Sequence, residues 1–311
     1  MSFQHIELRF PSADGIHSIY AELYIPTDRA PRGIIQLAHG MVDYTGRYRE
    51  LAEYMCGEGY IFAGHHHLGH GKSADCEEDF GFFAERGGVD LVLSDMYSMN
   101  KLLRERYPGL SVVVFGHSMG SFITRLYVRK YPHTVAAAII HGTGGPNSLL
   151  PVGKLLARVK KVLNGKRHKS KFLTRLAIGA YNRKFPKEEG HNAWLTRDLE
   201  TVKDRDTDPY ASFVFTTSGY YDLFSMLGEC NGKRWFREYP KSLPTLIISG
   251  ECDPVGSFGK GPRYVYKQLC LSGHSDVTIK MYEGARHELF NETCRREVFE
   301  YLAGWIGGVI R

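Results

Sequence analysis

The chain has 311 residues, of which 43% are hydrophobic and 24% charged, a composition that can bury a large core and argues against a disordered or fibrous protein. Its formal net charge of +6 is a modest surplus over this length, which usually serves solubility, and we expect no nucleic-acid partner. The longest apolar runs are far shorter than the roughly 18 to 20 residues that span a bilayer, which excludes a membrane-spanning role but not surface association. The polar N-terminus lacks the apolar stretch of a secretory signal, so we expect a cytoplasmic protein.

Six cysteines are scattered along the chain without a C-x-x-C pair or a regular spacing. In a chain without a secretory signal, this pattern favours free, buried thiols over disulfides. The residues are Cys56, Cys76, Cys230, Cys252, Cys270 and Cys294.

Short β-rich runs alternate with longer helical patterns, which is typical of a parallel sheet with helices on both faces. The first two runs, 6–10 and 19–25, alternate apolar with polar residues and predict half-exposed antiparallel strands at the sheet edge. The later runs are almost continuously apolar, as in strands covered on both faces, and lie at 33–38, 60–63, 111–115, 135–140, 245–248 and 277–279. Helical patterns that join them as crossovers lie at 48–57, 88–107, 118–130, 262–271 and 294–306.

The alternation stops between residue 144 and about residue 240, where helix-like and loop-like segments follow one another without a clear core strand. We interpret this stretch as a helical insertion that covers the carboxyl edge of the sheet. The expected organisation is a core of residues 1–143 and 241–311 with a cap, or lid, of residues 144–240. The predicted fold class is therefore α/β, with a mostly parallel central sheet flanked by helices and an inserted helical cap.

The strongest local pattern is Gly116-His117-Ser118-Met119-Gly120, which directly follows an apolar strand and directly precedes a helix. It matches the GxSxG nucleophile elbow together with the strand and helix that this motif requires. The serine of such an elbow lies on a sharp turn, where side chains on the flanking glycines would collide with neighbouring backbone. A chance match among 34 glycines is the alternative, and the strand–helix context argues against it. Ser118 is therefore the predicted nucleophile.

A serine hydroxyl needs a base within hydrogen-bond reach and a carboxylate that orients the base. In this fold the three residues follow in the order serine, acid, histidine. The strand at 245–248 runs into a turn that contains Asp253, the predicted acid, with Glu251 as the alternative acid and a purely structural turn as the other interpretation. His287 lies in a glycine-containing loop after the last strand and is the predicted base.

Two backbone amides are candidates for an oxyanion hole. Met41 follows a glycine turn at the end of the strand 33–38, and Met119 follows the serine at the start of its helix. Both amides can point toward the serine, and because they are backbone groups, their side chains need not be polar. A structural turn without a catalytic part is the alternative for Met41.

At these motifs the chain resembles the monoglyceride lipase and lysophospholipase group of α/β-hydrolases, which includes serine aminopeptidase S33-like sequences. The matching residues are His39-Gly40-Met41 with Gly46-Arg47-Tyr48, Gly69-His70-Gly71-Lys72-Ser73, Gly116 to Gly120, Asp253-Pro254, and Arg286-His287-Glu288 with Asn291-Glu292. The resemblance spans the chain from about residue 33 to its end without the cap. It implies the same triad, the same two amides and a variable lid that selects the substrate. One departure is His66, where the family commonly has Asp, and it bears on local packing and not on the triad.

Two further patterns predict no ligand. His65, His66 and His67 with His70 look like a metal cluster, but adjacent residues of a strand point to opposite faces and cannot all reach one ion. Residues 71–73 end like a phosphate-binding loop but lack the glycine that this motif requires at position 66. We expect neither a metal nor an organic cofactor, because water is the second substrate and the triad supplies both acid and base.

The predicted function is hydrolysis of a small-molecule carboxylic ester with an acyl chain, such as a monoacylglycerol or a lysophospholipid, through an acyl-enzyme. Apolar cap residues are candidates for an acyl pocket, although they can equally pack the cap onto the sheet: Phe172, Leu173, Leu176, Phe213, Phe215, Tyr220, Tyr221 and Phe224.

Three other functions remain open. An aminopeptidase or amidase would need an acidic cap residue for the substrate ammonium, for which the candidates are Glu188, Glu189, Asp204, Asp206 and Asp208. A thioesterase would use the same triad. A non-catalytic binding protein on a hydrolase scaffold would be expected to have a broken triad, and this triad is intact.

The early cap, residues 151–187, carries many lysines and arginines and no acidic residue. Apolar residues recur there at helical spacing, which predicts an amphipathic helix with a basic face: Val152, Leu155, Leu156, Val159, Val162 and Leu163. Such a helix can lie on an anionic membrane surface. We favour the other interpretation, in which the apolar stripe packs on the core and the lysines are merely solvated.

Overall fold

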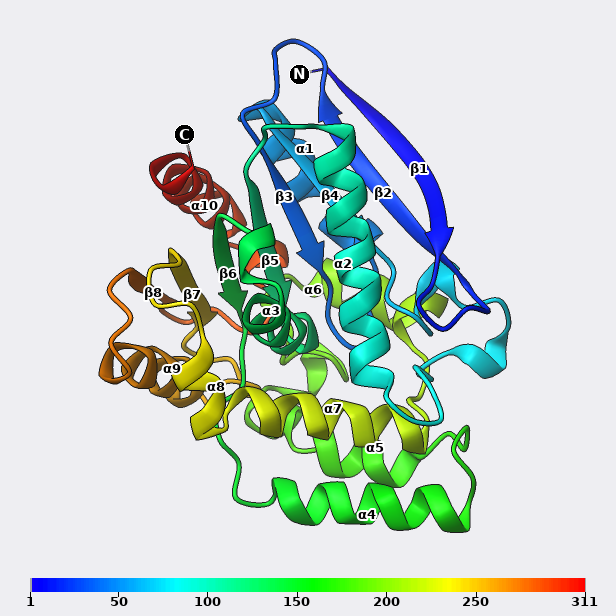
Figure 1. The fold of residues 1–311 in the computed structure, drawn as a ribbon. Helices are drawn as coiled ribbons and strands as arrows, with labels where there is room; N and C mark the ends of the chain where they lie inside the picture. Colours follow the sequence, from blue (N-terminus) through cyan, green and yellow to red (C-terminus); the bar gives the residue numbers. More distant parts are fainter. Residues whose placement is uncertain (1, 311) are drawn as a thin grey trace.

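Within residues 2–310, which the computed structural model describes, eight strands form one sheet (Figure 1). They are β1 (Phe3–Pro11), β2 (Ser18–Pro26), β3 (Gly33–Ala38), β4 (Tyr60–His65), β5 (Val112–His117), β6 (Ala137–His141), β7 (Thr245–Gly250) and β8 (Val277–Tyr282). Their order across the sheet is β1-β2-β4-β3-β5-β6-β7-β8. The pairs β1–β2 and β2–β4 are antiparallel and all the others are parallel, so the predicted mostly parallel α/β sheet is confirmed.

Helices cover both faces of the sheet, because successive strand residues point to opposite sides. In β5, Val112 and Val114 belong to a core that includes the helices α2 (Gly88–Arg106) and α3 (Met119–Lys130). Val113 and Phe115 belong to a second core, on the other face. The helices there are α1 (Arg49–Gly57) and α10 (Arg295–Val309), while α9 (Lys260–Leu271) joins the first core.

Two strand predictions need correction, and of the two N-terminal strands only β1 lies at the sheet edge. The second N-terminal strand was expected to be half-exposed, but β2 is buried from Ile19 to Tyr24 because it pairs with β1 on one side and β4 on the other. The run at 277–279 was expected to be covered on both faces. Instead β8 is mostly half-buried, because it is the edge strand opposite β1.

Residues 144–240, which we call the cap, contribute no strand to the sheet in the described part of the chain. They form α4 (Leu150–Leu163), α5 (Lys171–Ile178), α6 (Leu199–Thr207), α7 (Thr217–Cys230) and α8 (Lys233–Glu238). Figure 1 places α4, α5 and α7 beyond the arrowheads of β3, β5 and β6, at the end of the sheet where catalytic loops of α/β proteins gather. The domain boundaries at 144 and 240 remain a prediction.

The six cysteines, all within the described residues, are free, as predicted. Only Cys56 and Cys230 are buried, so the expectation of burial is wrong for the other four: Cys76 and Cys270 are exposed, and Cys252 and Cys294 are half-buried. These four lie in loops or at the outer ends of helices, where no second layer covers them.

Candidate active site

Ser118 lies on the turn between β5 and α3 with a φ of 55° and a ψ of −119°. A positive φ is unfavourable for a residue with a side chain, so the surrounding structure must hold this turn in place. A Cβ at Gly120 would collide with the carbonyl of Ala38, and one at Gly116 would collide with the carbonyl of Gly120. Both glycines are therefore required by close backbone approach, as the sequence motif predicts.

Asp253 and His287 meet although they follow different strands. The Nδ1 atom of His287 lies 2.9 Å from Oδ2 of Asp253, and both side chains are fully buried. The other carboxylate oxygen, Oδ1, accepts a hydrogen bond of 2.8 Å from the backbone amide of Val255. The Nε2 atom of His287 is buried and has no hydrogen-bond partner among the described residues. His287 is thus held from one side, and its free nitrogen belongs to a side chain that lines the same cavity as Ser118.

Glu251, the alternative acid, lies elsewhere. Its Oε1 atom accepts a hydrogen bond of 2.6 Å from Nη2 of Arg263, and both side chains are largely exposed. The geometry therefore brings Asp253, and not Glu251, to His287.

The two predicted oxyanion donors, Met41 and Met119, line the cavity together with Ser118. Met119 is the first residue of α3, where the amides of a helix lack an acceptor within the helix. The loop before Met41 is anchored by Asp43, whose Oδ2 accepts a hydrogen bond of 3.1 Å from the amide of Gly40. Met41 and Met119 thus share a cavity with Ser118, and their role as oxyanion donors remains a prediction.

A buried ion-pair network beside the serine was not predicted from sequence. Arg47 donates two hydrogen bonds, of 2.7 and 2.6 Å, to Glu288 and one of 3.2 Å to Asp43. Burial alone would raise the pKa of Glu288, but the charge and the hydrogen bonds of Arg47 lower it, so the carboxylate stays ionised. The network ties the loop that carries Met41 to the residue after His287. Arg47 and Glu288 both belong to motifs that carry the family resemblance, and this was the only sequence feature that could have drawn attention to them.

Two further buried histidines near His287 were not predicted from the sequence. The Nδ1 atoms of His117 and His141 lie 2.9 Å apart, and the ring centroid of His117 lies 4.6 Å from that of His287. Burial lowers the pKa of both residues, that of His141 to about 3. Both rings are therefore neutral; His117 packs against His287, and His141 packs against His117.

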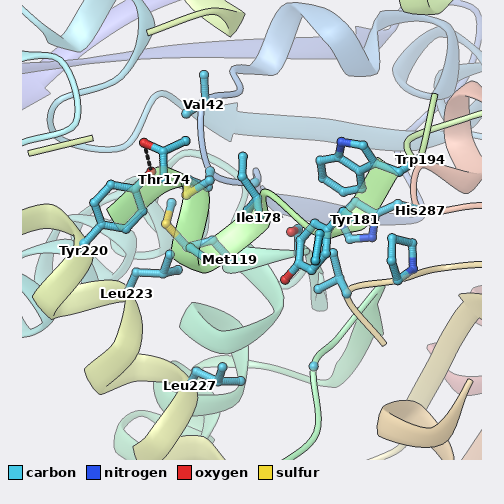
Figure 2. A pocket seen from close by; sticks show the side chains of 18 of the residues that line it. Val42, Met119, Thr174, Ile178, Tyr181, Trp194, Tyr220, Leu223, Leu227 and His287 are labelled. Carbon is cyan, nitrogen blue, oxygen red and sulfur yellow. Dashed lines mark hydrogen bonds between the residues drawn. The ribbon is translucent and has the colours of Figure 1, made fainter. Parts of the chain in front are cut away.

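A cavity of about 760 Å³ connects the core residues to the cap. Its apolar wall includes Ile178, Leu223 and Leu227, while Tyr181 and Trp194 lie beside His287 (Figure 2). The ring centroid of Trp194 is 5.2 Å from that of His287. Of the eight cap residues considered for an acyl pocket, those that line the cavity are Leu176, Phe213, Tyr220 and Phe224. The others do not: Leu173 and Phe215 are core residues, Phe172 is exposed and Tyr221 is half-buried.

The acidic cap residues are distributed unevenly around this cavity. Only Asp206 lines it, where it accepts a hydrogen bond of 2.5 Å from Asn192. The other four candidates lie outside the lining: Glu188, Glu189, Asp204 and Asp208.

The apolar stripe of α4 faces solvent, so the interpretation that it packs on the core is wrong. Five of its six residues are between 43% and 79% exposed: Val152, Leu155, Val159, Val162 and Leu163. The face that packs inward instead carries the small residues Gly153 and Ala157. Within residues 2–310, no helix is long and apolar enough to cross a membrane.

His66, where the family resemblance leads us to expect an aspartate, is held by two polar contacts. Its Nδ1 atom accepts a hydrogen bond of 2.8 Å from the amide of Lys72, and its Nε2 atom lies 2.8 Å from the hydroxyl of Thr45. Burial lowers the pKa of His66 well below its usual value, so the ring is neutral. Among the described residues, no group of three or more His, Cys, Asp or Glu side chains is arranged to hold a metal ion.

Comparisons with known proteins identify the family of the chain. The family model described as serine aminopeptidase, S33, matches residues 29–294. The chain is 27% identical to a monoacylglycerol lipase of Mycolicibacterium smegmatis, over 96% of each chain, and 28% identical to human monoglyceride lipase, over 95% of this chain and 88% of the human one. A highly thermostable carboxyl esterase from Bacillus coagulans, solved in complex with glycerol, superposes with a TM-score of 0.90 at 31% identity over the whole of both chains. The chain is therefore a serine hydrolase that belongs to the serine aminopeptidase S33 family of α/β-hydrolases, in the monoacylglycerol lipase group.

Proposed function

We propose that this protein hydrolyses a carboxylic ester between an acyl chain and a small alcohol, such as a monoacylglycerol or a lysophospholipid. The observation that carries the proposal is one cavity, lined by Ser118 and His287 at one side and by apolar cap residues at the other. The names of the relatives, monoacylglycerol lipase and carboxyl esterase, support the same class of substrate.

The reaction would proceed through an acyl-enzyme. Ser118 gives its hydroxyl proton to Nε2 of His287 while Oγ attacks the ester carbonyl, and the developing oxyanion is held by the amides of Met41 and Met119. Asp253 stabilises the imidazolium, which then protonates the departing alcohol as the C–O bond breaks. A water molecule, activated by the same histidine, releases the acid and restores Ser118.

Active-site labelling tests this mechanism. A fluorophosphonate should label Ser118 alone among the serines, because in the proposed mechanism only this hydroxyl gives its proton to His287. Ser118→Ala should abolish labelling and lower turnover by several orders of magnitude, while the thermal transition stays cooperative. Labelling that survives the substitution would contradict the assignment of the nucleophile.

A substrate panel of aryl esters, monoacylglycerols, lysophospholipids, thioesters and aminoacyl amides decides between ester hydrolysis and the alternatives. Of the five acidic cap residues considered for an aminopeptidase, only Asp206 lines the cavity, and the residue before it is the cavity-lining Arg205, whose charge would repel an ammonium. We therefore expect aminoacyl amides to be poor substrates. A kcat/KM for an amide above that for every ester would establish amidase activity instead.

We also propose that residues 144–240 act as the substrate-selecting cap, and that α4 contacts an anionic membrane. The exposed apolar stripe of α4 is flanked by Lys154, Lys160 and Lys161, an arrangement suited to a negatively charged interface. Each lysine near such a surface contributes about 1 kcal/mol, and salt screens the attraction. Co-sedimentation with phosphatidylglycerol vesicles should therefore be strong at low salt and weaker at high salt. Absence of binding at low salt would overturn the membrane proposal without touching the esterase one.

A further inference from the structure

Arg205, on the cap helix α6, is a buried cation that lines the cavity. Its side chain forms no ion pair with a carboxylate in the described part of the chain, and its Nε and Nη1 atoms are buried without any hydrogen-bond partner. Burial and the charge of Arg47 lower its pKa, but a guanidinium remains protonated in proteins. A buried, charged group without partners is rare in folded proteins and calls for a ligand.

The two carboxylates in its neighbourhood are already occupied. Glu288 accepts two hydrogen bonds from Arg47 and one of 2.9 Å from Asn291. Asp43 accepts from Arg47, from the hydroxyl of Tyr48 at 2.6 Å, and from two backbone amides. These contacts use the oxygens of both groups, so the Nε and Nη1 donors of Arg205 have no partner among the described residues, although its side chain lines the cavity.

Arg205 lies on the side of the cavity where the alcohol part of an ester substrate would lie. It lies close enough to His117 and Glu288, the residues next to Ser118 and His287 in sequence, for its charge to lower the pKa of both. The alcohol leaves with a proton from His287, so it must lie on this side of the cavity. The acyl chain has the apolar wall formed by Ile178, Leu223 and Leu227.

We propose that Arg205 binds a phosphate on the alcohol part of the substrate and so extends the specificity of the site to acylglycerol phosphates and related lysophospholipids. The planar guanidinium can donate two parallel hydrogen bonds to a pair of phosphate oxygens. The inference rests on the proposed ester hydrolysis and adds the chemistry of the leaving group. A purely structural role, in which Arg205 balances the charge of Asp43 and Glu288 through space, is the alternative.

The first test compares 1-octanoylglycerol with 1-octanoylglycerol 3-phosphate, which differ only in the phosphate, both below their critical micelle concentrations. In Arg205→Gln, the ratio of kcat/KM for the phosphate ester to that for the neutral ester should fall by about 10- to 100-fold, the effect of losing a charge-assisted hydrogen bond. Arg205→Lys keeps the positive charge but cannot donate two parallel hydrogen bonds, so the ratio of kcat/KM should fall less in this variant than in Arg205→Gln. Lys203→Gln makes the same charge change at an exposed position of α6 and should leave the ratio unchanged. An equal loss for both esters, together with a lower Tm, would assign Arg205 the structural role.

The second test does not depend on either ester being a substrate. Glycerol 3-phosphate should inhibit hydrolysis of 4-nitrophenyl butyrate competitively and more tightly than glycerol, and this difference should disappear in Arg205→Gln. Equal inhibition of the native protein by the two compounds would overturn the proposal even if the glutamine variant does not fold. If inorganic phosphate inhibits as tightly as glycerol 3-phosphate, Arg205 binds a free anion. This result would overturn the proposal that Arg205 binds a phosphate on the alcohol part of the substrate. If neither octanoyl ester is cleaved, the acylglycerol proposal fails, while the inhibitor series still decides the role of Arg205.

Discussion

The cavity has two unlike walls, one from the sheet core and one from the cap. On the core wall, Ser118 and His287 follow β5 and β8. The Nδ1 atom of His287 lies 2.9 Å from Oδ2 of the buried Asp253, which follows β7. On the cap wall, the side chains are mostly apolar, and the one buried cation, Arg205, has no described partner. The comparison shows that the histidine of the core wall has a carboxylate within the protein at 2.9 Å, whereas the cation of the cap wall has buried donors without a partner among the described residues.

The largest expected effect is a loss of activity when Asp253, the predicted acid of the triad, is changed. Asp253→Asn should lower kcat by about 10⁴-fold with little change in Tm, because an amide cannot hold the correct tautomer of His287 or stabilise its charged form. Initial rates with an aryl ester measure the loss.

The matched control is Glu251→Gln, which removes a carboxylate only two residues away. Glu251 pairs with Arg263 near the surface, so this variant should retain the kcat of the native protein. The reverse result, a harmless Asp253→Asn and an inactive Glu251→Gln, would exchange the two roles.

The next effect concerns the stability of the core wall. Arg47→Met leaves Glu288 and Asp43 buried without their cation, which should lower the free energy of unfolding by about 3 to 5 kcal/mol. Urea denaturation measures it. The control is Arg49→Met, two residues after Arg47, which breaks the exposed ion pair between Arg49 and Glu53. It should change the free energy of unfolding little, because surface ion pairs contribute little to stability. Equal losses in both variants would show that the buried network has no special part in stability.

A smaller, pH-dependent effect is expected where the cap meets the core. Burial raises the pKa of Asp222, on α7, to about 7, although Lys161 and Lys154 oppose the rise, and its Oδ2 atom is buried without a partner in the described structure. Because the folded-state pKa lies above the unfolded value of about 4, the contribution of Asp222 to stability is present below pH 4 and is lost as the pH rises through 7. Asp222→Asn should therefore raise the free energy of unfolding at pH 8 by about 2 to 4 kcal/mol relative to its effect at pH 4.

Chemical denaturation at the two pH values measures this difference. The control is Asp204→Asn, because Asp204 is an exposed carboxylate of the cap. This variant should change the free energy of unfolding by the same amount at pH 4 and at pH 8. A gain at pH 8 no larger than at pH 4 would mean that Asp222 is ionised in the folded protein without cost.

Most of the core could be predicted from the sequence because each element there has a local signal. Continuous apolar runs mark the parallel strands, and the GxSxG pattern marks a turn in which Gly116 and Gly120 cannot carry a Cβ. Strand order along the chain then predicted that Asp253 and His287 would follow strands near Ser118. The errors at β2 and β8 have one cause: burial of a strand depends on its neighbours in the sheet, which its own residues do not specify.

The cap could be predicted only as a set of helices. Nothing in the pattern of α6 distinguishes Arg205 from its exposed neighbour Lys203, since the burial of a long cationic side chain is decided by tertiary packing. The same limit applies to α4, where periodicity predicted an amphipathic helix but not which face would be covered. The inward face has Gly153 and Ala157, small enough for close packing, and the apolar stripe is left outside.

The smallest effect on stability should come from that stripe, where the cap differs most from the core. Val152→Ser with Leu155→Ser changes two side chains that are 54% and 59% exposed, so the free energy of unfolding should change by less than about 0.5 kcal/mol. The same double variant should bind phosphatidylglycerol vesicles more weakly, because its apolar area no longer enters the interface. The control is Val112→Ser in β5, a buried valine, which should be clearly destabilising since it places a hydroxyl in the core. If the double variant is as destabilised as the control, the stripe is covered in the folded protein and α4 is a packing helix. If stability and vesicle binding are both unchanged, its apolar surface has no membrane role.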